Sequence, residues 1–143
     1  EKNYSSKMDK SIQSLKKEIS SLAQICHEHG AKLKTIIEVG ELKTINNIAL
    51  ASKTALESGS DFIKTSTGKA AINANLEAAS IMVNELKAFY EKTGELRGFK
   101  PAGGIKTKEQ AQGYLELMIN AFGIENVGAH NFRIGASSLV DQL

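Results

Sequence analysis

The sequence predicts an α/β fold in which helices alternate with short parallel strands. Four segments carry apolar residues at helical spacing, and four short segments rich in β-branched or aromatic residues follow them in turn. Each strand-like segment ends in small or glycine-containing turns. The predicted order is αβαβαβαβ, and helical crossovers of this kind require parallel strands with right-handed connections.

An amphipathic helix is predicted first, with Gly30 as its stop. Its apolar residues lie three or four positions apart, as one helical stripe requires: Ile12, Leu15, Ile19, Leu22 and Ile25. Residues 33–40 (LKTIIEVG) are β-branched and close on glycine, which predicts the first strand. Thr44 can cap a second helix, which we expect to end at Gly59.

The middle of the chain repeats this order. Residues 61–68 (DFIKTSTG) are predicted as the second strand. Asn73 or Asn75 can cap the third helix, which should end near Gly94. Residues 97–104 (RGFKPAGG) are then predicted as the third strand, opening into a glycine loop.

The last helix and strand complete the predicted series. Thr107 and Gln110 have the spacing of a capping box. The helix behind them carries an apolar face made of Ala111, Tyr114, Leu115, Met118 and Phe122. Residues 131–138 (NFRIGASS) are predicted as the fourth strand, which again ends in small residues.

A doubly wound sheet and a (β/α)8 TIM barrel both fit this order, and the strand faces favour the barrel. One face of the strands carries the cations Lys34, Lys64, Lys100 and Arg133, and the other carries Ile37, Ile63 and Phe99. Polar groups on the inner face near strand ends are typical of barrel active sites. A complete barrel needs roughly 250 residues. We therefore expect residues 1–143 to supply about four βα units of one barrel domain, its C-terminal half, preceded by a helix.

Composition narrows the possible partners and compartment. The net charge of +2 is too balanced to favour a nucleic-acid or membrane-surface partner. No window approaches eighteen apolar residues. The single cysteine, Cys26, excludes an internal disulfide framework and favours a reducing compartment, with the cytoplasm as our expectation.

Two inward lysines suggest covalent chemistry. Ammonium groups about 5 Å apart repel by roughly 3 kcal/mol at an effective dielectric near 20, which lowers one lysine pKa by about two units. A neutral amine can attack a carbonyl to form a Schiff base. Lys64 and Lys100 would then be nucleophile and perturber, in one order or the other. The alternative is that each lysine pairs with a carboxylate such as Glu38 or extends into solvent.

Small residues past the strand ends suggest a phosphate site, because glycines let backbone N–H groups approach an anion and a helix starting near Ser137 would add its dipole. They are Gly68, Lys69, Gly103, Gly104, Gly135, Ser137 and Ser138. The alternative is that they only form tight turns. Gly68 and Lys69 lack the spacing of a Walker A loop. Cys26, His27 and His29 have no second metal-ligand cluster, which favours a helix end.

Four motifs, LKTIIEVGEL, DFIKTSTGKAA, GFKPAGGIKT and FRIGASS, closely resemble deoxyribose-phosphate aldolase from about Lys10 onward. The resemblance implies a class I aldolase on a (β/α)8 barrel, without metal or other cofactor. The implied reaction interconverts 2-deoxy-D-ribose 5-phosphate with acetaldehyde and D-glyceraldehyde 3-phosphate. Such an enzyme is a lyase of deoxyribonucleotide catabolism.

The resemblance also assigns roles. It implies that Lys64 forms the Schiff base, that Lys100 depresses the pKa of the nucleophile, and that Lys34 assists polar contacts or proton transfer. The substrate- and phosphate-binding positions it implies are Thr67, Gly68, Lys69, Gly103, Gly104, Gly135, Ser137 and Ser138.

One departure concerns extent. The family's first four strands, with the aspartate that shuttles protons, have no counterpart in residues 1–143. A half barrel has two open strand edges, so we expect this chain to be inactive alone, to form a dimer, or to pair with an N-terminal half. The alternatives are a non-catalytic phosphate-binding or protein-interaction module, and another Schiff-base aldolase on the same barrel.

Overall fold

The protein contains a three-stranded parallel sheet with the order β1-β2-β3. A computed structural model describes residues 2–142 and the side chains of residues 9–141. The strands are β1 (Lys34–Ile36), β2 (Phe62–Lys64) and β3 (Gly98–Lys100). Their spatial order follows the chain without reversal, unlike a doubly wound sheet, in which the order reverses at a switch point. The α/β class is confirmed, and the sequential order suits part of a barrel.

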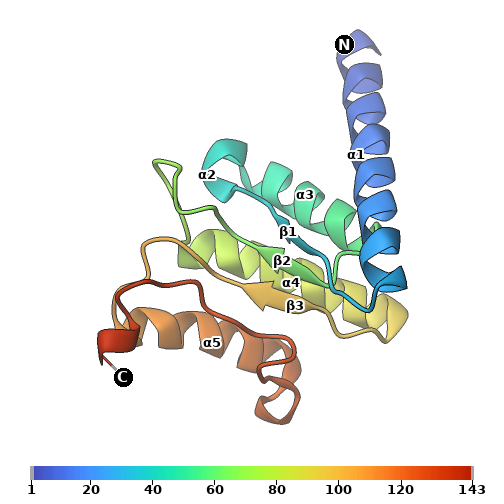
Figure 1. The fold of residues 1–143 in the computed structure, drawn as a ribbon. Helices are drawn as coiled ribbons and strands as arrows, with labels where there is room; N and C mark the ends of the chain where they lie inside the picture. The colour runs from blue at the N-terminus through green and yellow to red at the C-terminus, as the bar shows by residue number, and fades with distance from the viewer. Residues whose placement is uncertain (1, 143) are drawn as a thin grey trace.

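The helices form a layer along the sheet. They are α1 (Lys2–Glu28), α2 (Val39–Leu42), α3 (Ile45–Glu57), α4 (Leu76–Thr93) and α5 (Lys108–Phe122), with short 3-10 helices η1 (Ile124–Asn126) and η2 (Val140–Gln142). Neighbouring helices α3, α4 and α5 pack against one another, and α1 rises beside α3 and extends beyond the rest of the molecule (Figure 1). This arrangement turns one face of each strand toward helices and leaves the other for a site.

Capping residues set the helix starts as the sequence predicts. The side chain of Thr44 accepts a hydrogen bond from the amide three residues later, and so does that of Thr107, whose partner Gln110 completes a capping box. Of the two candidates for α4, Asn75 is the cap. Each side chain satisfies an amide that the first helical turn leaves unpaired.

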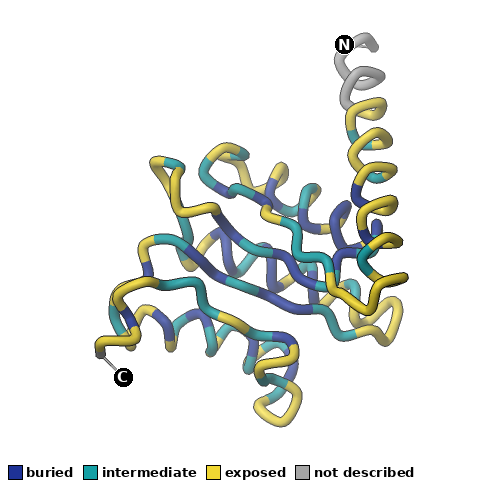
Figure 2. The backbone as a smooth tube through the Cα atoms, viewed as in Figure 1, coloured by how far each residue is buried: buried dark blue, intermediate teal, exposed yellow. Residues whose placement is uncertain are grey.

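The core lies between the sheet and the helix layer. Ile63 of β2 and Phe99 of β3 are fully buried there, and Ile37 joins the same cluster. From the helices it receives chiefly Ile48, Leu56, Met82, Leu86 and Met118. Figure 2 shows β2 and β3 as mostly buried, β1 as intermediate to exposed, and the described part of α1 as mostly exposed. The prediction that Ile37, Ile63 and Phe99 occupy the face opposite the lysines is confirmed.

The observed strands are shorter than predicted. The first ends at Ile36 instead of reaching Gly40, and α2, which the sequence did not indicate, starts at Val39. Glu38 causes the change, because its backbone is left-handed (φ 55°, ψ 64°) and turns the chain out of the extended conformation.

Residues 131–138 do not form the regular fourth strand that the sequence predicts. They run extended beside β3 and make two isolated parallel bridges, Phe99 to Phe132 and Ala102 to Gly135. Pro101 lies between the bridges and has no backbone N–H, so the ladder is interrupted there. Its carbonyl still accepts from the Gly135 amide at 2.9 Å.

The exposed apolar side chains within residues 9–141 include groups on α1 and at the edge of the sheet. On α1, Ile19 and Ala23 are buried, whereas Leu15, Leu22 and Ile25 are 42%, 47% and 56% exposed. Ile36 of β1 is 41% exposed, and within residues 2–142 nothing pairs with the outer edge of that strand. Among the described helices, none is long and apolar enough to cross a membrane.

Candidate active site

Three lysines converge on the sheet face that points away from the helix layer. Lys64 ends β2 and lies in register with Lys100, which ends β3. Lys34 starts β1 opposite Phe62. All three lysines are half-buried. Because side chains alternate along a strand, placing Ile63 and Phe99 in the core fixes the lysines on the opposite face.

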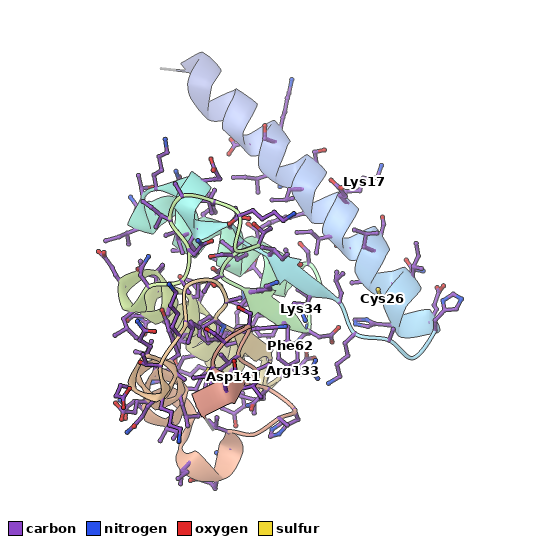
Figure 3. All side chains as sticks on the ribbon, turned by 60° about the vertical axis from the view of Figure 1, so that its left-hand side comes forward. Lys17, Cys26, Lys34, Phe62, Arg133 and Asp141 are labelled. Atoms are coloured by element: carbon purple, nitrogen blue, oxygen red, sulfur yellow. The ribbon has the colours of Figure 1, made fainter. Side chains whose placement is uncertain are left out.

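An aromatic ring supports this cluster. Phe62 is 2% exposed, and the guanidinium of Arg133 stacks over its ring at 4.7 Å. Gly98 lies so close to the ring that a Cβ there would overlap it, so glycine is required for this approach. Figure 3 labels Lys34, Phe62 and Arg133, which come from three different segments of the chain. Arg133 therefore adds a fourth cation to the same face, as the sequence suggested.

Electrostatics within the cluster act on Lys100. Burial is the largest cause that lowers the pKa of Lys100, followed by the positive charge of Lys34, a hydrogen bond with Lys34, and the charge of Arg133. The cations that depress it thus come from β1 and from residues 131–138, whereas the sequence argument considered only the pair of Lys64 and Lys100. The sequence placed Lys34 on the same face but did not show that its charge acts on Lys100, which follows from the pairing of β1 with β2 and of β2 with β3.

The alternative of ordinary ion pairs does not apply to these lysines. Among the described side chains, Lys34, Lys64 and Lys100 make no salt bridge. Glu38, the carboxylate considered as a partner, instead accepts from the backbone amide of Thr67. The positive charge on this face is therefore left without a counter-ion in the described structure, which suits an anionic ligand.

A pocket of about 350 Å³ opens at the carboxyl ends of the strands. Its lining includes Lys64 and most of the phosphate-site residues predicted from the sequence: Thr67, Gly68, Gly103, Gly104, Gly135, Ser137 and Ser138. Gly68 and Gly104 have left-handed backbones (φ 88° and 78°) with open space where a Cβ would be. An anion can thus approach the backbone closely at both positions.

Two basic residues near this pocket differ from expectation. Lys69 is exposed and is not among the lining residues, although its amide donates to the Thr67 hydroxyl at 3.2 Å. Lys106, which the sequence analysis missed, does line the pocket. Its position two residues after Gly104 was a usable signal, because a cation next to a glycine loop suits an anion.

A helix was expected to start near Ser137, and this is wrong. Ser137 and Ser138 are exposed, and only the three-residue η2 follows, beginning at Val140. A single 3-10 turn lacks the aligned peptide dipoles of an α-helix. Anion binding here would therefore depend on hydroxyl and amide donors. Among the described residues, no group of three or more His, Cys, Asp or Glu side chains could hold a metal ion.

Comparison with known proteins bears on these features. The profile of the DeoC/LacD family aldolases matches residues 2–140. The chain belongs to the DeoC/LacD aldolase family. It is 46% identical over 136 residues to a Caenorhabditis elegans protein described as a candidate deoxyribose-phosphate aldolase, covering 95% of this chain and 44% of that protein. It is 44% identical over 126 residues to the deoxyribose-phosphate aldolase of Mus musculus, covering 88% of this chain and 39% of the mouse protein.

A solved structure supports the fold of this family member. The tetrameric deoxyribose phosphate aldolase from Aeropyrum pernix superposes with a TM-score of 0.64 at 23% identity, covering 90% of this chain and 47% of that one. The chain thus spans less than half the length of these relatives. The resemblance seen in the four sequence motifs is confirmed at the level of the family.

Proposed function

We propose that the chain carries the Schiff-base site of a deoxyribose-phosphate aldolase. The reaction interconverts 2-deoxy-D-ribose 5-phosphate with acetaldehyde and D-glyceraldehyde 3-phosphate. One observation carries the proposal: Lys64 lies in register with Lys100 and at the edge of a pocket lined by glycines and hydroxyls. An amine beside a phosphate-sized pocket suits an aldehyde whose far end is a phosphate monoester.

In the proposed mechanism, the neutral amine of Lys64 attacks C1 of the ring-opened sugar phosphate, and loss of water gives an iminium ion. A base removes the proton of the C3 hydroxyl, and the electrons of the C2–C3 bond flow into the iminium. Glyceraldehyde 3-phosphate leaves, and an enamine of acetaldehyde stays on Lys64. Protonation at C2 and hydrolysis then release acetaldehyde and restore the amine.

The neighbouring cations have separate roles in this proposal. Lys100, whose pKa is lowered by burial and by the charges of Lys34 and Arg133, can pass a proton between water and substrate. Lys34 supports this role because its positive charge is one of the causes of the lowered pKa of Lys100. The phosphate would lie against pocket residues Thr67, Gly68, Gly103, Gly104, Gly135, Ser137 and Ser138, with Lys106 as an additional cation. Lys69, which follows Gly68 outside the pocket lining, would contribute its charge from the same loop.

We further propose that residues 1–143 form the C-terminal half of one TIM-barrel domain, with about four βα units. The uncovered edge of β1 and the exposed apolar residues of α1 support a partner there, either the N-terminal half of the barrel or a second copy in a dimer. The family's proton-shuttling aspartate would come from that other half. The single cysteine supports a reducing, cytoplasmic compartment.

Borohydride reduction tests the proposal directly. The intact mass of the chain is measured after reduction with acetaldehyde and, separately, with deoxyribose 5-phosphate. We expect an adduct on the wild type that is lost in Lys64→Leu. Loss in Lys100→Leu with retention in Lys64→Leu would assign the nucleophile to Lys100. Phosphate binding without any adduct would favour a non-catalytic binding module instead.

A further inference from the structure

The turn that follows β1 has an unusual backbone. Glu38 is left-handed, a conformation that residues with a Cβ rarely adopt, and among residues 2–142 only Lys43 shares this property without being glycine. Such strained residues persist where the surrounding contacts hold them, and they gather at functional sites. The contacts of Glu38 should therefore show which part of the structure requires this backbone conformation.

Backbone and side chain both fasten this turn to the loop after β2, which we define as residues 65–72. The Ile37 amide donates to the Lys64 carbonyl at 2.8 Å, and the Val39 amide donates to the Thr65 carbonyl at 3.0 Å. Between them, both carboxylate oxygens of Glu38 accept from the Thr67 amide, at 3.3 and 3.2 Å. The turn is thus hydrogen-bonded to three residues of the neighbouring segment, Lys64, Thr65 and Thr67.

The far end of the same loop also rests on this turn. A Cβ on Gly40 would overlap the Ile72 carbonyl oxygen, so only glycine permits that approach. Inside the loop, the Thr67 hydroxyl accepts from the Lys69 amide at 3.2 Å. A short chain of contacts therefore runs from the Glu38 carboxylate through Thr67 to Lys69.

The described structure shows the Glu38 carboxylate hydrogen-bonded to the Thr67 amide and not paired with a cation. This carboxylate makes no salt bridge among the described side chains, although several cations lie on the neighbouring face. Hydrogen bonds from a backbone amide to a carboxylate are stronger than those between neutral groups. Thr67 and Gly68 line the pocket, so displacement of the Thr67 amide would move the pocket wall.

We propose that Glu38 is a positioning residue for the phosphate end of the substrate. Its carboxylate fixes the Thr67 amide and so sets the loop that presents Thr67 and Gly68 at a fixed distance from Lys64. The proposal rests on the aldolase function proposed above, and it adds a residue that acts through the loop without touching the reacting atoms.

Two substitutions separate the carboxylate from the backbone conformation. Glu38→Gly removes the side chain but suits the left-handed backbone, whereas Glu38→Gln keeps the shape and one acceptor oxygen without the charge. We expect the half-saturating concentration of deoxyribose 5-phosphate for adduct formation to rise about tenfold in Glu38→Gly and less in Glu38→Gln. The maximal rate of adduct formation with deoxyribose 5-phosphate, and the rate of adduct formation with acetaldehyde, should each change by less than about twofold.

Hydrogen exchange gives a second readout of the same contact that does not depend on adduct formation. Hydrogen exchange at the Thr67 amide should become about tenfold faster in Glu38→Gly. Glu41→Gln is the matched control, because Glu41 is an exposed acid on α2 whose side chain makes no salt bridge among the described residues, and it should leave both readouts unchanged.

The outcomes distinguish this proposal from the aldolase function. Unchanged exchange at Thr67, or faster exchange with an unchanged half-saturating concentration, would overturn the role of Glu38. If the wild type forms no adduct with either compound, the aldolase function fails, and the dissociation constant for inorganic phosphate takes the place of half-saturation. An increase of about tenfold in that constant in Glu38→Gly supports the role, while an equal constant or no binding by the wild type overturns it.

Discussion

The two ends of the sheet differ in how their polar groups are satisfied. At the carboxyl ends of the strands, Lys64 and Lys100 have no counter-ion among the described residues, and glycine loops surround a pocket. At the amino ends, the side chains of Asp61 and Arg97 form hydrogen bonds and ion pairs with neighbouring residues. Asp61 Oδ2 contacts His27 Nε2 and accepts from the Leu33 amide, both at 2.8 Å.

The amino end is organised by charge pairing. Arg97 donates to the Ser60 carbonyl at 2.7 Å and to the Glu95 carboxylate at 2.6 Å. Burial raises the pKa of Asp61, but hydrogen bonds from His27 and the Leu33 amide, together with the charges of His27 and Arg97, bring it below its ordinary value. The interactions at this end therefore hold α1, β1 and β2 together. In TIM barrels likewise, one end of the strands contributes to stability and the other carries the active site.

The largest expected effect is at the carboxyl end. Lys64→Leu should reduce the rate of adduct formation at least about 10³-fold, because the proposed mechanism takes its attacking amine from Lys64. Its free energy of unfolding should stay within about 0.5 kcal/mol of the wild type, since Lys64 makes no salt bridge among the described residues. Urea titration and trapping kinetics measure the two quantities. Lys87→Leu, at an exposed position on α4, is the control, and a large loss of stability in Lys64→Leu would break the contrast between the ends.

The second effect is at the amino end. Asp61→Ala should lower the free energy of unfolding by about 2 kcal/mol, because it removes hydrogen bonds to a charged group. The pKa of folded Asp61 lies below the ordinary 3.8, so its contribution is present above that pH and is lost as pH falls through the folded value. Urea unfolding at pH 7 and near pH 3 should show the mutant and wild type converging in acid. If Asp61→Ala reduced the trapping rate as much as Lys64→Leu, the amino end would also take part in the chemistry, and the contrast between the two ends would be wrong.

A smaller effect is expected on titration at the carboxyl end. Lys34→Met removes the charge that is the second cause of the lowered pKa of Lys100, while burial, the first cause, stays. The pKa of Lys100 should therefore move up toward its ordinary value, so that Lys100 holds its proton to higher pH. The Lys100 Cε signal in NMR, followed against pH, reports this shift. Lys32→Met, which alters an exposed neighbour, should not move the signal, and an unmoved signal in Lys34→Met would exclude coupling of the two amines.

The smallest effect concerns a helix cap near the pocket. Thr107→Ala should cost about 1 kcal/mol of unfolding free energy, because the Gln110 amide loses its acceptor at 3.3 Å. Adduct formation should be unchanged, since the cap stabilises α5 without entering the pocket. Thermal unfolding with trapping in parallel checks both. Gln112→Ala, on the exposed side of the same helix, should change stability by only a few tenths of a kcal/mol.

Much of the fold follows from local sequence. The helix spacing, the caps at Thr44 and Thr107, and the core positions of Ile63 and Phe99 were predictable, and Asn75 was one of two candidates for the cap of α4. Strand lengths were not, because a β-branched run does not show where pairing stops. Residues 131–138 are the clearest case, since their regularity depends on Pro101, which directly follows β3 and lies some thirty residues away along the chain.

The candidate site divides in the same way. The lysine motifs and glycine loops could be read from the sequence, because alternation along a strand and small residues after it are local properties. Three interactions could not be read from the sequence: the effect of Lys34 on the pKa of Lys100, the pairing of His27 with Asp61, and the hydrogen bond from the Thr67 amide to Glu38. Each joins residues roughly thirty or more positions apart.

The sequence by itself determined which strand residues face the helices, the caps at Thr44 and Thr107, and which family this chain belongs to. Tertiary structure alone decided which cation depresses the pKa of Lys100, which carboxylate is bound to a backbone amide, and which loops line the pocket. The reason is physical: periodicity and capping act within one or two turns of chain, whereas electrostatic coupling and hydrogen bonding between loops depend on distances that only the packed sheet sets.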